Sequence, residues 1–280
     1  MSHKKTKLQN IKNAKIILQL ALLLLYVFIC NGNGNARAVG QSYKDCKTCP
    51  EMVVVPSGSY TSYSRKNING TSLQQKINFQ NSFSLSKFEI TFNEWDECVK
   101  NRQCSQIPDD HNWGRGMRPV INIKYSDIVQ YLGWLSELTG YTYRLPSESE
   151  WEYAAVADSR NTYSQELRLK KGLVNCRDCG TKWSGIKSAP VGQFPPNSLG
   201  LHDMLGNVFE YVQDCWTKNR NTPHPNGLPI VWKNCPSKVI KGGAWYYLSK
   251  AAHPRFRARN NINFASYILG FRVLGEIKQK

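Results

Sequence analysis

Apolar residues recur at helical spacing in three stretches of the chain, and each stretch begins with a capping signal. Thr91 and Glu94 are spaced as a capping box, as are Ser147 and Glu150, and a third helix is expected to begin near 126–127 and to end at Gly140. The apolar faces of these helices are predicted to comprise Trp95, Cys98 and Val99, then Ile128, Tyr131, Leu132, Leu135 and Leu138, then Trp151, Ala154 and Ala155.

Strand-like runs are short and widely separated. Met52–Val55 is β-branched and stops at Pro56, and Phe83–Ile90 alternates apolar and polar residues as a half-buried strand would. Two further runs, Lys238–Ile240 and Phe271–Leu274, return late in the chain. Elsewhere beyond residue 160 Gly, Pro, Asn and Trp are frequent without periodicity, which predicts an α+β domain with little regular secondary structure.

The first 38 residues have the organisation of a signal peptide. Basic residues precede an apolar run, Ile16–Cys30, and a polar stretch that contains an A-x-A site at Ala36 and Ala38. The run is 15 residues long, whereas a spanning helix needs about 20. We expect cleavage after Ala38, export to the periplasm or the medium, and no stable membrane span afterwards; a retained signal anchor is the alternative.

Cysteine usage agrees with export. Removal of Cys30 leaves eight of the nine cysteines, an even number that in an oxidising compartment indicates disulfides. Near neighbours would pair as Cys46–Cys49, Cys98–Cys104, Cys176–Cys179 and Cys215–Cys235. The two C-x2-C spacings also fit a zinc site, which stays open as the alternative.

The net charge restricts the partners. The whole chain carries +17, and residues 1–38 contain six basic and no acidic residues, so the remainder carries +11. That balance favours anionic surfaces or ligands. No dense Lys/Arg run interleaved with aromatic residues occurs, so nucleic acid is not expected.

Five blocks in order resemble the formylglycine-generating-enzyme (sulfatase-modifying factor) family. Arg144–Ala155 (RLPSESEWEYAA) and Phe194–Glu210 (FPPNSLGLHDMLGNVFE) are similar to two signature segments of that family. Lys241–Trp245 (KGGAW) resembles its RGGSW turn, Leu269–Val273 (LGFRV) its closing strand, and Met52–Tyr60 (MVVVPSGSY) its opening.

The resemblance implies a compact variant of the C-type-lectin-like fold, poor in regular secondary structure. We expect residues 1–38 to be the signal peptide, 39–50 a lead-in and 51–276 the sulfatase-modifying-factor-type domain. Gly242–Gly243 would form a turn whose backbone excludes a Cβ. The resemblance places the edge of the family's substrate groove at this turn. Ser147 and Glu150 need only cap a helix, and Glu148 and Glu152 would pair with basic groups.

The resemblance also implies a structural calcium ion. Two carboxylates seven residues apart flank a Gly-Asn turn, and calcium prefers several hard oxygen ligands. The family's ligands correspond to the side chains of Asp203 and Glu210 and the carbonyl groups of Gly206 and Val208; a hydrogen-bonded turn is the alternative. A second calcium site at Asn175 is not expected, since no acid accompanies it near Trp183.

The copper-thiolate chemistry of the family's oxidase has no counterpart in the sequence. By the resemblance, the family's oxidase uses two cysteines after the Gly-Gly turn. The last cysteine of this sequence, Cys235, precedes that turn. No copper is therefore expected by the cysteine route. Three functions stay open: a binding module for a protein, peptide or anionic ligand, a different metal-dependent enzyme on the same fold, and a non-canonical maturation factor.

The candidate ligand groove follows the Gly-Gly turn. His253 could act as a general base or simply form hydrogen bonds. The alternating arginines suit an anionic ligand, or one edge of a strand whose other face packs Phe256. The predicted groove residues are Trp245, Tyr246, Tyr247, His253, Arg255, Arg257 and Arg259.

The signal peptide generates the first prediction. N-terminal sequencing of protein recovered outside the cytoplasm should begin at Val39, because the A-x-A site ends at Ala38. Recovery of Met1 on membrane-bound protein would instead establish a retained anchor.

Overall fold

The computed structural model describes residues 38–66, 72–156, 170–218 and 223–277. The predicted signal peptide lies outside the described residues. Within the described part of the chain, no helix is both long and apolar enough to span a membrane. Residues 38–280 group as one compact unit, which is the unit considered below.

The three predicted helices are present, and their caps are local. Helix α2 (Phe92–Lys100) has the Thr91–Glu94 capping box, and α4 (Glu148–Ala155) has the Ser147–Glu150 box. Helix α3 (Tyr125–Thr139) ends at Gly140 with φ +70°, as expected. It begins slightly earlier than predicted, because Asp127 accepts a hydrogen bond from the backbone of Lys124 and makes Lys124 the N-cap.

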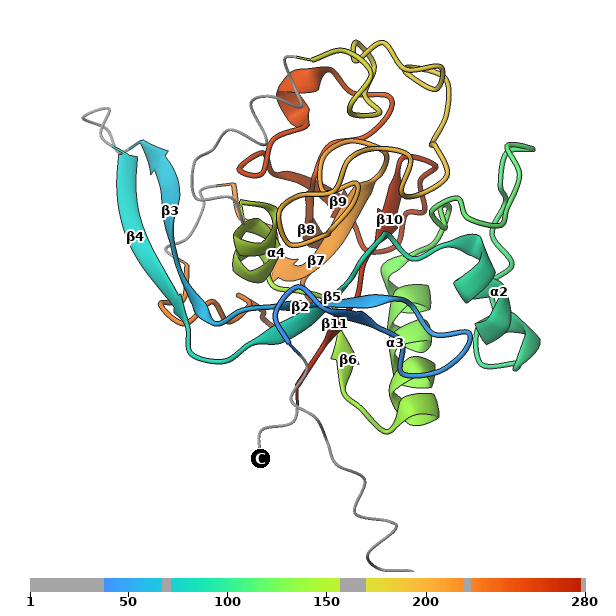
Figure 1. Ribbon diagram of the computed structural model, residues 1–280, viewed down its shortest axis with the longest axis horizontal. Helices are drawn as coiled ribbons and strands as arrows, with labels where there is room; N and C mark the ends of the chain where they lie inside the picture. Colours follow the sequence, from blue (N-terminus) through green and yellow to red (C-terminus); the bar gives the residue numbers. More distant parts are fainter. Residues whose placement is uncertain (1–37, 67–71, 157–169, 219–222, 278–280) are drawn as a thin grey trace, which may run out of the picture. The chain divides into compact units, whose positions relative to one another are not determined.

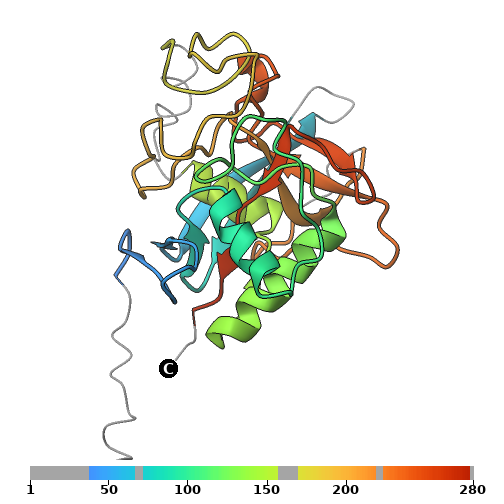
Figure 2. The same cartoon turned by 90° about the vertical axis from the view of Figure 1, so that its right-hand side faces the viewer.

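Three sheets carry the rest of the regular structure (Figures 1 and 2). The five-stranded sheet has the order β1 (Ser42–Tyr43), β2 (Met52–Val55), β5 (Phe83–Ser86), β11 (Leu274–Gly275) and β6 (Tyr143–Arg144). The four-stranded sheet has the order β10 (Leu269–Phe271), β7 (Phe209–Cys215), β8 (Ser237–Lys241) and β9 (Ala258–Asn261). Strands β3 (Gly58–Lys66) and β4 (Ser72–Phe79) form a separate hairpin, and a short 3₁₀ turn, η1, spans Ser249–Ala251.

Two strand predictions need correction. Strand β5 ends at Ser86 and is buried throughout, not half-buried to Ile90. Of its two serines, Ser86 tolerates burial because its hydroxyl donates to the Phe88 carbonyl (2.7 Å) and accepts from the Val273 amide (3.1 Å). The predicted single strand 271–274 is two strands, β10 and β11, which belong to different sheets.

The last two strands, β10 and β11, each join one of the two larger sheets. Strand β11 lies between β5 and β6, where Leu274 is opposite both Leu85 and Arg144. Strand β10 runs parallel to β7, with Gly270 opposite Glu210. Strand β11 therefore occupies an interior position in the five-stranded sheet, and β10 forms one edge of the four-stranded sheet.

The core consists of two large apolar clusters and one small one. The first surrounds α2, α3 and the four-stranded sheet, with Trp95 stacked on Tyr131 at 5.6 Å. The second lies between the five-stranded sheet and α4, with Trp151 fully buried. The third is a satellite cluster under the 170–190 loops and contains Cys176 and Cys179. These clusters place α4 and the end of β8 at the centre of the site described below.

All four predicted disulfides are present: Cys46–Cys49, Cys98–Cys104, Cys176–Cys179 and Cys215–Cys235. The zinc alternative for the C-x2-C pairs is therefore not supported, since both sulfurs of each pair are bonded to each other. Every cysteine of the described residues is oxidised.

The disulfides generate a stability prediction. The Cys215–Cys235 bond closes the longest loop of the four, 20 residues, so replacing both cysteines by serine should lower the free energy of unfolding by about 3 kcal/mol. The Cys46–Cys49 bond spans a separation of only 3 residues, so replacing both of these cysteines by serine should lower the free energy of unfolding by about 2 kcal/mol in the same chain-entropy model. Urea denaturation of both double variants, with thiol titration of the denatured unreduced protein, measures this. A larger loss at Cys46–Cys49 would contradict the loop-length argument, and titratable thiols would contradict the pairing.

Candidate functional site

The Gly242–Gly243 turn directly follows strand β8, and both glycines have positive φ (+91° and +83°). A Cβ on Gly243 would lie 2.9 Å from the backbone of Ala251. One on Gly242 would lie 3.2 Å from the Met204 carbonyl oxygen and 3.3 Å from the Trp151 ring. Side chains are therefore excluded at both positions, as the sequence predicted, and the two residues that follow, Ala244 and Trp245, are buried.

An aromatic cluster forms around Trp245. The Trp245 side chain is 4% exposed, and its ring packs against Trp113 (5.3 Å), Tyr246 (5.4 Å) and Tyr267 (5.9 Å). His111 contacts both Trp113 and Tyr267 at 5.2 Å. Sequence reasoning missed His111, Trp113 and Tyr267, because they come from loops distant in sequence and carry no local periodicity.

Three tyrosines of this region reach solvent, and we call them the tyrosine surface: Tyr246, Tyr247 and Tyr267. Their exposed fractions are 46%, 41% and 41%. Tyr247 is held from beneath by Phe209, whose ring it meets edge-on at 5.0 Å. The cluster therefore offers aromatic rings on a rigid, buried base, an arrangement suited to binding.

Arg257, the middle residue of the predicted arginine row, is held by a structural contact. Arg257 forms a two-point ion pair with Glu148 (2.9 and 3.1 Å), and its guanidinium lies 4.7 Å from the Trp216 ring. Arg255 and Arg259 are exposed. Of the three, Arg257 is thus occupied by a structural contact.

His253 stabilises the turn that precedes β9. Its Nδ1 accepts a hydrogen bond from the Arg255 amide (3.0 Å), and its carbonyl accepts one from Phe256 (2.9 Å). These contacts agree with the hydrogen-bonding alternative of the sequence analysis. The general-base hypothesis gains no support from them.

The expected pairing of Glu148 and Glu152 with basic groups is confirmed. Lys241, fully buried at the end of β8, donates to Glu152 at 2.7 Å and lies 3.5 Å from Glu148. Glu148 is therefore shared between Lys241 and Arg257. This network attaches helix α4 to strand β8 directly before the Gly-Gly turn.

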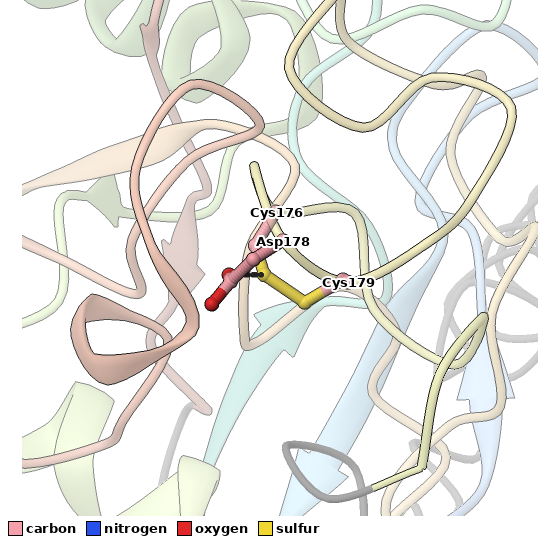
Figure 3. A group of neighbouring side chains, drawn as sticks. All are labelled: Cys176, Asp178 and Cys179. Atoms are coloured by element: carbon pink, nitrogen blue, oxygen red, sulfur yellow. Dashed lines mark hydrogen bonds between the residues drawn. A yellow bond between two sulfur atoms is a disulfide. The ribbon is translucent and has the colours of Figure 1, made fainter.

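The Cys176–Cys179 disulfide loop fastens the segment that follows the turn. Figure 3 shows Asp178 beside this disulfide. The Asp178 carboxylate accepts hydrogen bonds from the Ser249 amide (2.6 Å) and hydroxyl (3.0 Å). Partial burial raises the pKa of Asp178, but these hydrogen bonds outweigh it and leave the pKa below its ordinary value. The sulfur and carboxylate ligand atoms lie within 4.8 Å of one another, but the sulfurs are bonded in the disulfide and are not thiolates.

A buried ion pair lies beneath the turn. The Arg272 guanidinium donates to both oxygens of Glu210 (2.6 and 2.7 Å), and the Trp151 indole N–H donates to Glu210 at 2.6 Å. Arg272 also donates to the carbonyl groups of Ser86 (2.9 Å) and His202 (3.0 Å). Both carboxylate oxygens of Glu210 are therefore satisfied within the protein.

Two more buried carboxylates lie in the same region. Glu89 accepts hydrogen bonds from the Asn207 side-chain amide (2.7 Å) and the Val208 backbone amide (3.1 Å). Asp203 accepts through Oδ2 from the Gly192 amide (2.7 Å). Its other oxygen, Oδ1, is buried and has no hydrogen-bond partner among the described residues.

These carboxylates carry more negative charge than Arg272 compensates. Burial raises the pKa of Asp203 to about 6, although the Gly192 hydrogen bond and Arg272 oppose it. Burial also raises the pKa of Glu89 well above its ordinary value, and the charges of Asp203 and Glu210 raise it further. With all three acids ionised the group would hold −2, which either protons or a cation must balance.

The predicted calcium ligands fit this geometry in part. The unpartnered Asp203 oxygen and the uncompensated charge suit a hard cation. Glu210 already accepts hydrogen bonds at both oxygens, two at Oε2 from Arg272 and Trp151 and one at Oε1 from Arg272. Calcium at Asp203 and Glu210, with the carbonyl groups of Gly206 and Val208, stays a prediction.

Comparison with known proteins relates the sequence of this chain to one family. The family model described as "Sulfatase-modifying factor enzyme 1-like domain" matches residues 38–277. The formylglycine-generating enzyme of Mycobacterium tuberculosis is 30% identical over 188 residues, covering 58% of this chain and 58% of that enzyme. The mouse (Mus musculus) enzyme of the same name is 30% identical over 188 residues, covering 60% of this chain and 47% of the enzyme. The chain thus matches about half of the length of these curated relatives.

One solved structure is similar over nearly the whole domain. PvdO from Pseudomonas aeruginosa superposes with a TM-score of 0.76 at 29% sequence identity. The match covers 86% of this chain and all of that chain. The complete domain, and not only its signature segments, therefore has a counterpart of known structure.

Asp203 generates a prediction that separates a cation from protons. Without a bound cation, Asp203→Asn should stabilise the protein at pH 7.5 by up to about 3 kcal/mol, because a pKa raised from 3.8 to about 6 makes ionisation costly in the folded state. The raised pKa means that the contribution of Asp203 to stability is complete below pH 4 and is lost as the pH rises through 6. The gain from Asp203→Asn should therefore vanish near pH 4.

Melting curves with calcium and with chelator complete this test. If calcium binds, chelator should lower the melting temperature of the wild type at pH 7.5, and Asp203→Asn should abolish that difference. The exposed Glu137→Gln variant controls for a general change of charge. A wild-type curve unaffected by calcium, with a stabilised variant, would exclude the calcium prediction.

Proposed function

The chain belongs to the sulfatase-modifying factor enzyme 1-like family, and we propose that it is an exported binding module of that family without copper-cysteine oxidase chemistry. The tyrosine surface is the observation that carries the proposal. It exposes three aromatic rings beside the turn at which the family resemblance places the groove. Its ligand would be a protein, a peptide or an anionic molecule.

Rigidity supports a binding role for this surface. Trp245 donates its backbone N–H to the Asn207 carbonyl (2.8 Å) and accepts from the Gly185 amide (3.0 Å). The backbone carbonyl of Tyr247 accepts from the Arg177 amide at 2.8 Å. A surface already held in place loses little conformational entropy when a ligand binds.

The state of the cysteines supports the absence of copper-thiolate chemistry. A soft Cu(I) ion needs thiolate ligands. All eight cysteines of the described residues are in disulfides, and no cysteine follows Cys235 in the sequence. The segment after the Gly-Gly turn offers no thiol, and its single histidine, His253, cannot supply the thiolate pair that the family's oxidase uses.

Export is part of the same proposal. Four disulfides among the described residues are typical of an oxidising compartment. They agree with the predicted signal peptide and with a site outside the cytoplasm, periplasmic or secreted.

An oxidase assay tests the proposal. Purified protein, copper, oxygen and a peptide carrying a sulfatase cysteine motif should give no aldehyde product by mass spectrometry, because the chain has no thiolate pair beyond the turn. A formylglycine-generating enzyme assayed in parallel controls for the peptide and the copper. Copper-dependent aldehyde formation would overturn the proposal. Turnover that survives copper chelation would overturn it too, in favour of a different metal-dependent enzyme on the same fold.

A further inference from the structure

Acidic residues are absent from a long stretch of the chain that forms the site. Residues 215–275 contain ten Lys and Arg residues and no Asp or Glu. Two fully buried cations of this stretch are compensated by carboxylates elsewhere, Lys241 by Glu152 and Arg272 by Glu210. A third buried cation, Lys238, donates to the Gln213 carbonyl at 2.8 Å. The exposed ones, such as Lys250 next to the tyrosine surface, face solvent without an acid from their own segment.

The disulfide loop adds an arginine to this surface. The exposed Arg177 lies between Cys176 and Cys179, and its guanidinium is 5.5 Å from the centre of the Tyr246 ring. Its backbone N–H binds the Tyr247 carbonyl, so the loop and the tyrosines form one unit. The neighbouring Asp178 is turned toward Ser249, which leaves the cation and not the acid beside the exposed ring.

The loops that meet here are close in space although they are distant in sequence. Figures 1 and 2 both show the yellow loops of residues 170–190 beside the orange-red turn of η1. Lys182 lies over the Trp183 ring at 4.5 Å, and the same loop binds the Trp245 carbonyl through Gly185. On the disulfide-loop side, Arg177 therefore lies beside the exposed Tyr246 ring, while Lys182 covers Trp183 of the same loop.

We propose that the tyrosine surface, with Arg177, binds an acidic polysaccharide. This inference rests on the proposed binding function and names the ligand class of the same surface. Tyrosine presents an apolar ring face, which packs against the C–H face of a sugar ring, and a hydroxyl, which reaches sugar hydroxyls. Arg177 would pair with a carboxylate or sulfate through its planar fork of donors.

A polymer fits the layout better than a small anion. The three exposed tyrosines follow one another around the buried Trp245: its ring centre lies 5.9 Å from Tyr267 and 5.4 Å from Tyr246, and Tyr247 lies 6.2 Å from Tyr246. Such a row can contact several units of a repeating ligand, each with a ring and a charge. A single small anion would use Arg177 and leave the rest of the row uncovered.

Binding of the purified protein to alginate, a polyuronate, tests the inference. We expect binding that weakens as the salt concentration rises, with no binding to neutral dextran. Arg177→Ala and Tyr246→Ala should each weaken alginate binding about tenfold, as expected for one charge-assisted contact and one stacked ring. Lys76→Ala removes the same charge from the exposed face of β4 and should change the affinity less than twofold, on the order expected for a screened distant charge.

Thermal melting of each variant verifies that it is folded. The side chains of Arg177, Tyr246 and Lys76 are all exposed, so no loss of folding is expected. Equal weakening by Lys76→Ala and Arg177→Ala would overturn the inference, because diffuse charge would then explain the binding. Absence of alginate binding, with Tyr246-dependent binding of poly-glutamate, would overturn the polysaccharide assignment and leave the binding-module proposal in place. Copper-dependent aldehyde formation in the oxidase assay would overturn the proposed function itself, so the two failures are distinguishable.

Discussion

The buried Glu210–Arg272 ion pair joins more of this domain than any other contact described. Glu210 lies on β7, while Arg272 lies in the short connection between β10 and β11, so the pair links the strands that close both larger sheets. Arg272 also binds the carbonyl after β5, and Glu210 holds the Trp151 indole of α4. A buried pair is stabilising only if its remaining hydrogen-bonding groups are satisfied, and here they are. Loss of either partner would leave an uncompensated charge at the meeting point of two sheets and a helix.

A second network of charges positions the binding surface. Lys241 ends β8 inside the protein and is paired with acids of α4, and the Gly-Gly turn follows immediately. Arg257 shares Glu148 with it from the other side, which explains why that arginine is not available to a ligand. The cation beside the exposed Tyr246 ring, Arg177, comes instead from the disulfide loop. The acids of α4 thus hold two basic residues, Lys241 and Arg257, in structural contacts.

Local features were predictable from the sequence, and tertiary ones were not. The caps at Thr91 and Ser147, the Gly140 stop and the three short-range disulfides depend on neighbours within a few residues. Strand β7 was missed because it is buried almost throughout and shows no alternation, and the β3–β4 hairpin because its polar strands resemble loops. At the site, Trp245, Tyr246 and Tyr247 are consecutive and were found together. Their partners Trp113, Tyr267 and Arg177 meet them only through the fold.

The interior position of β11 has a consequence for the order in which the chain can fold during synthesis. Strand β2 can pair with β5 early, but the place between β5 and β6 is filled only by residues 274–275. Arg272, which neutralises Glu210, arrives at the same moment. Until residues 269–275 have been synthesised and released, the chain therefore lacks both the strand between β5 and β6 and the counter-ion of Glu210. Products truncated before residue 269 lack these contacts and are expected to stay open to proteases.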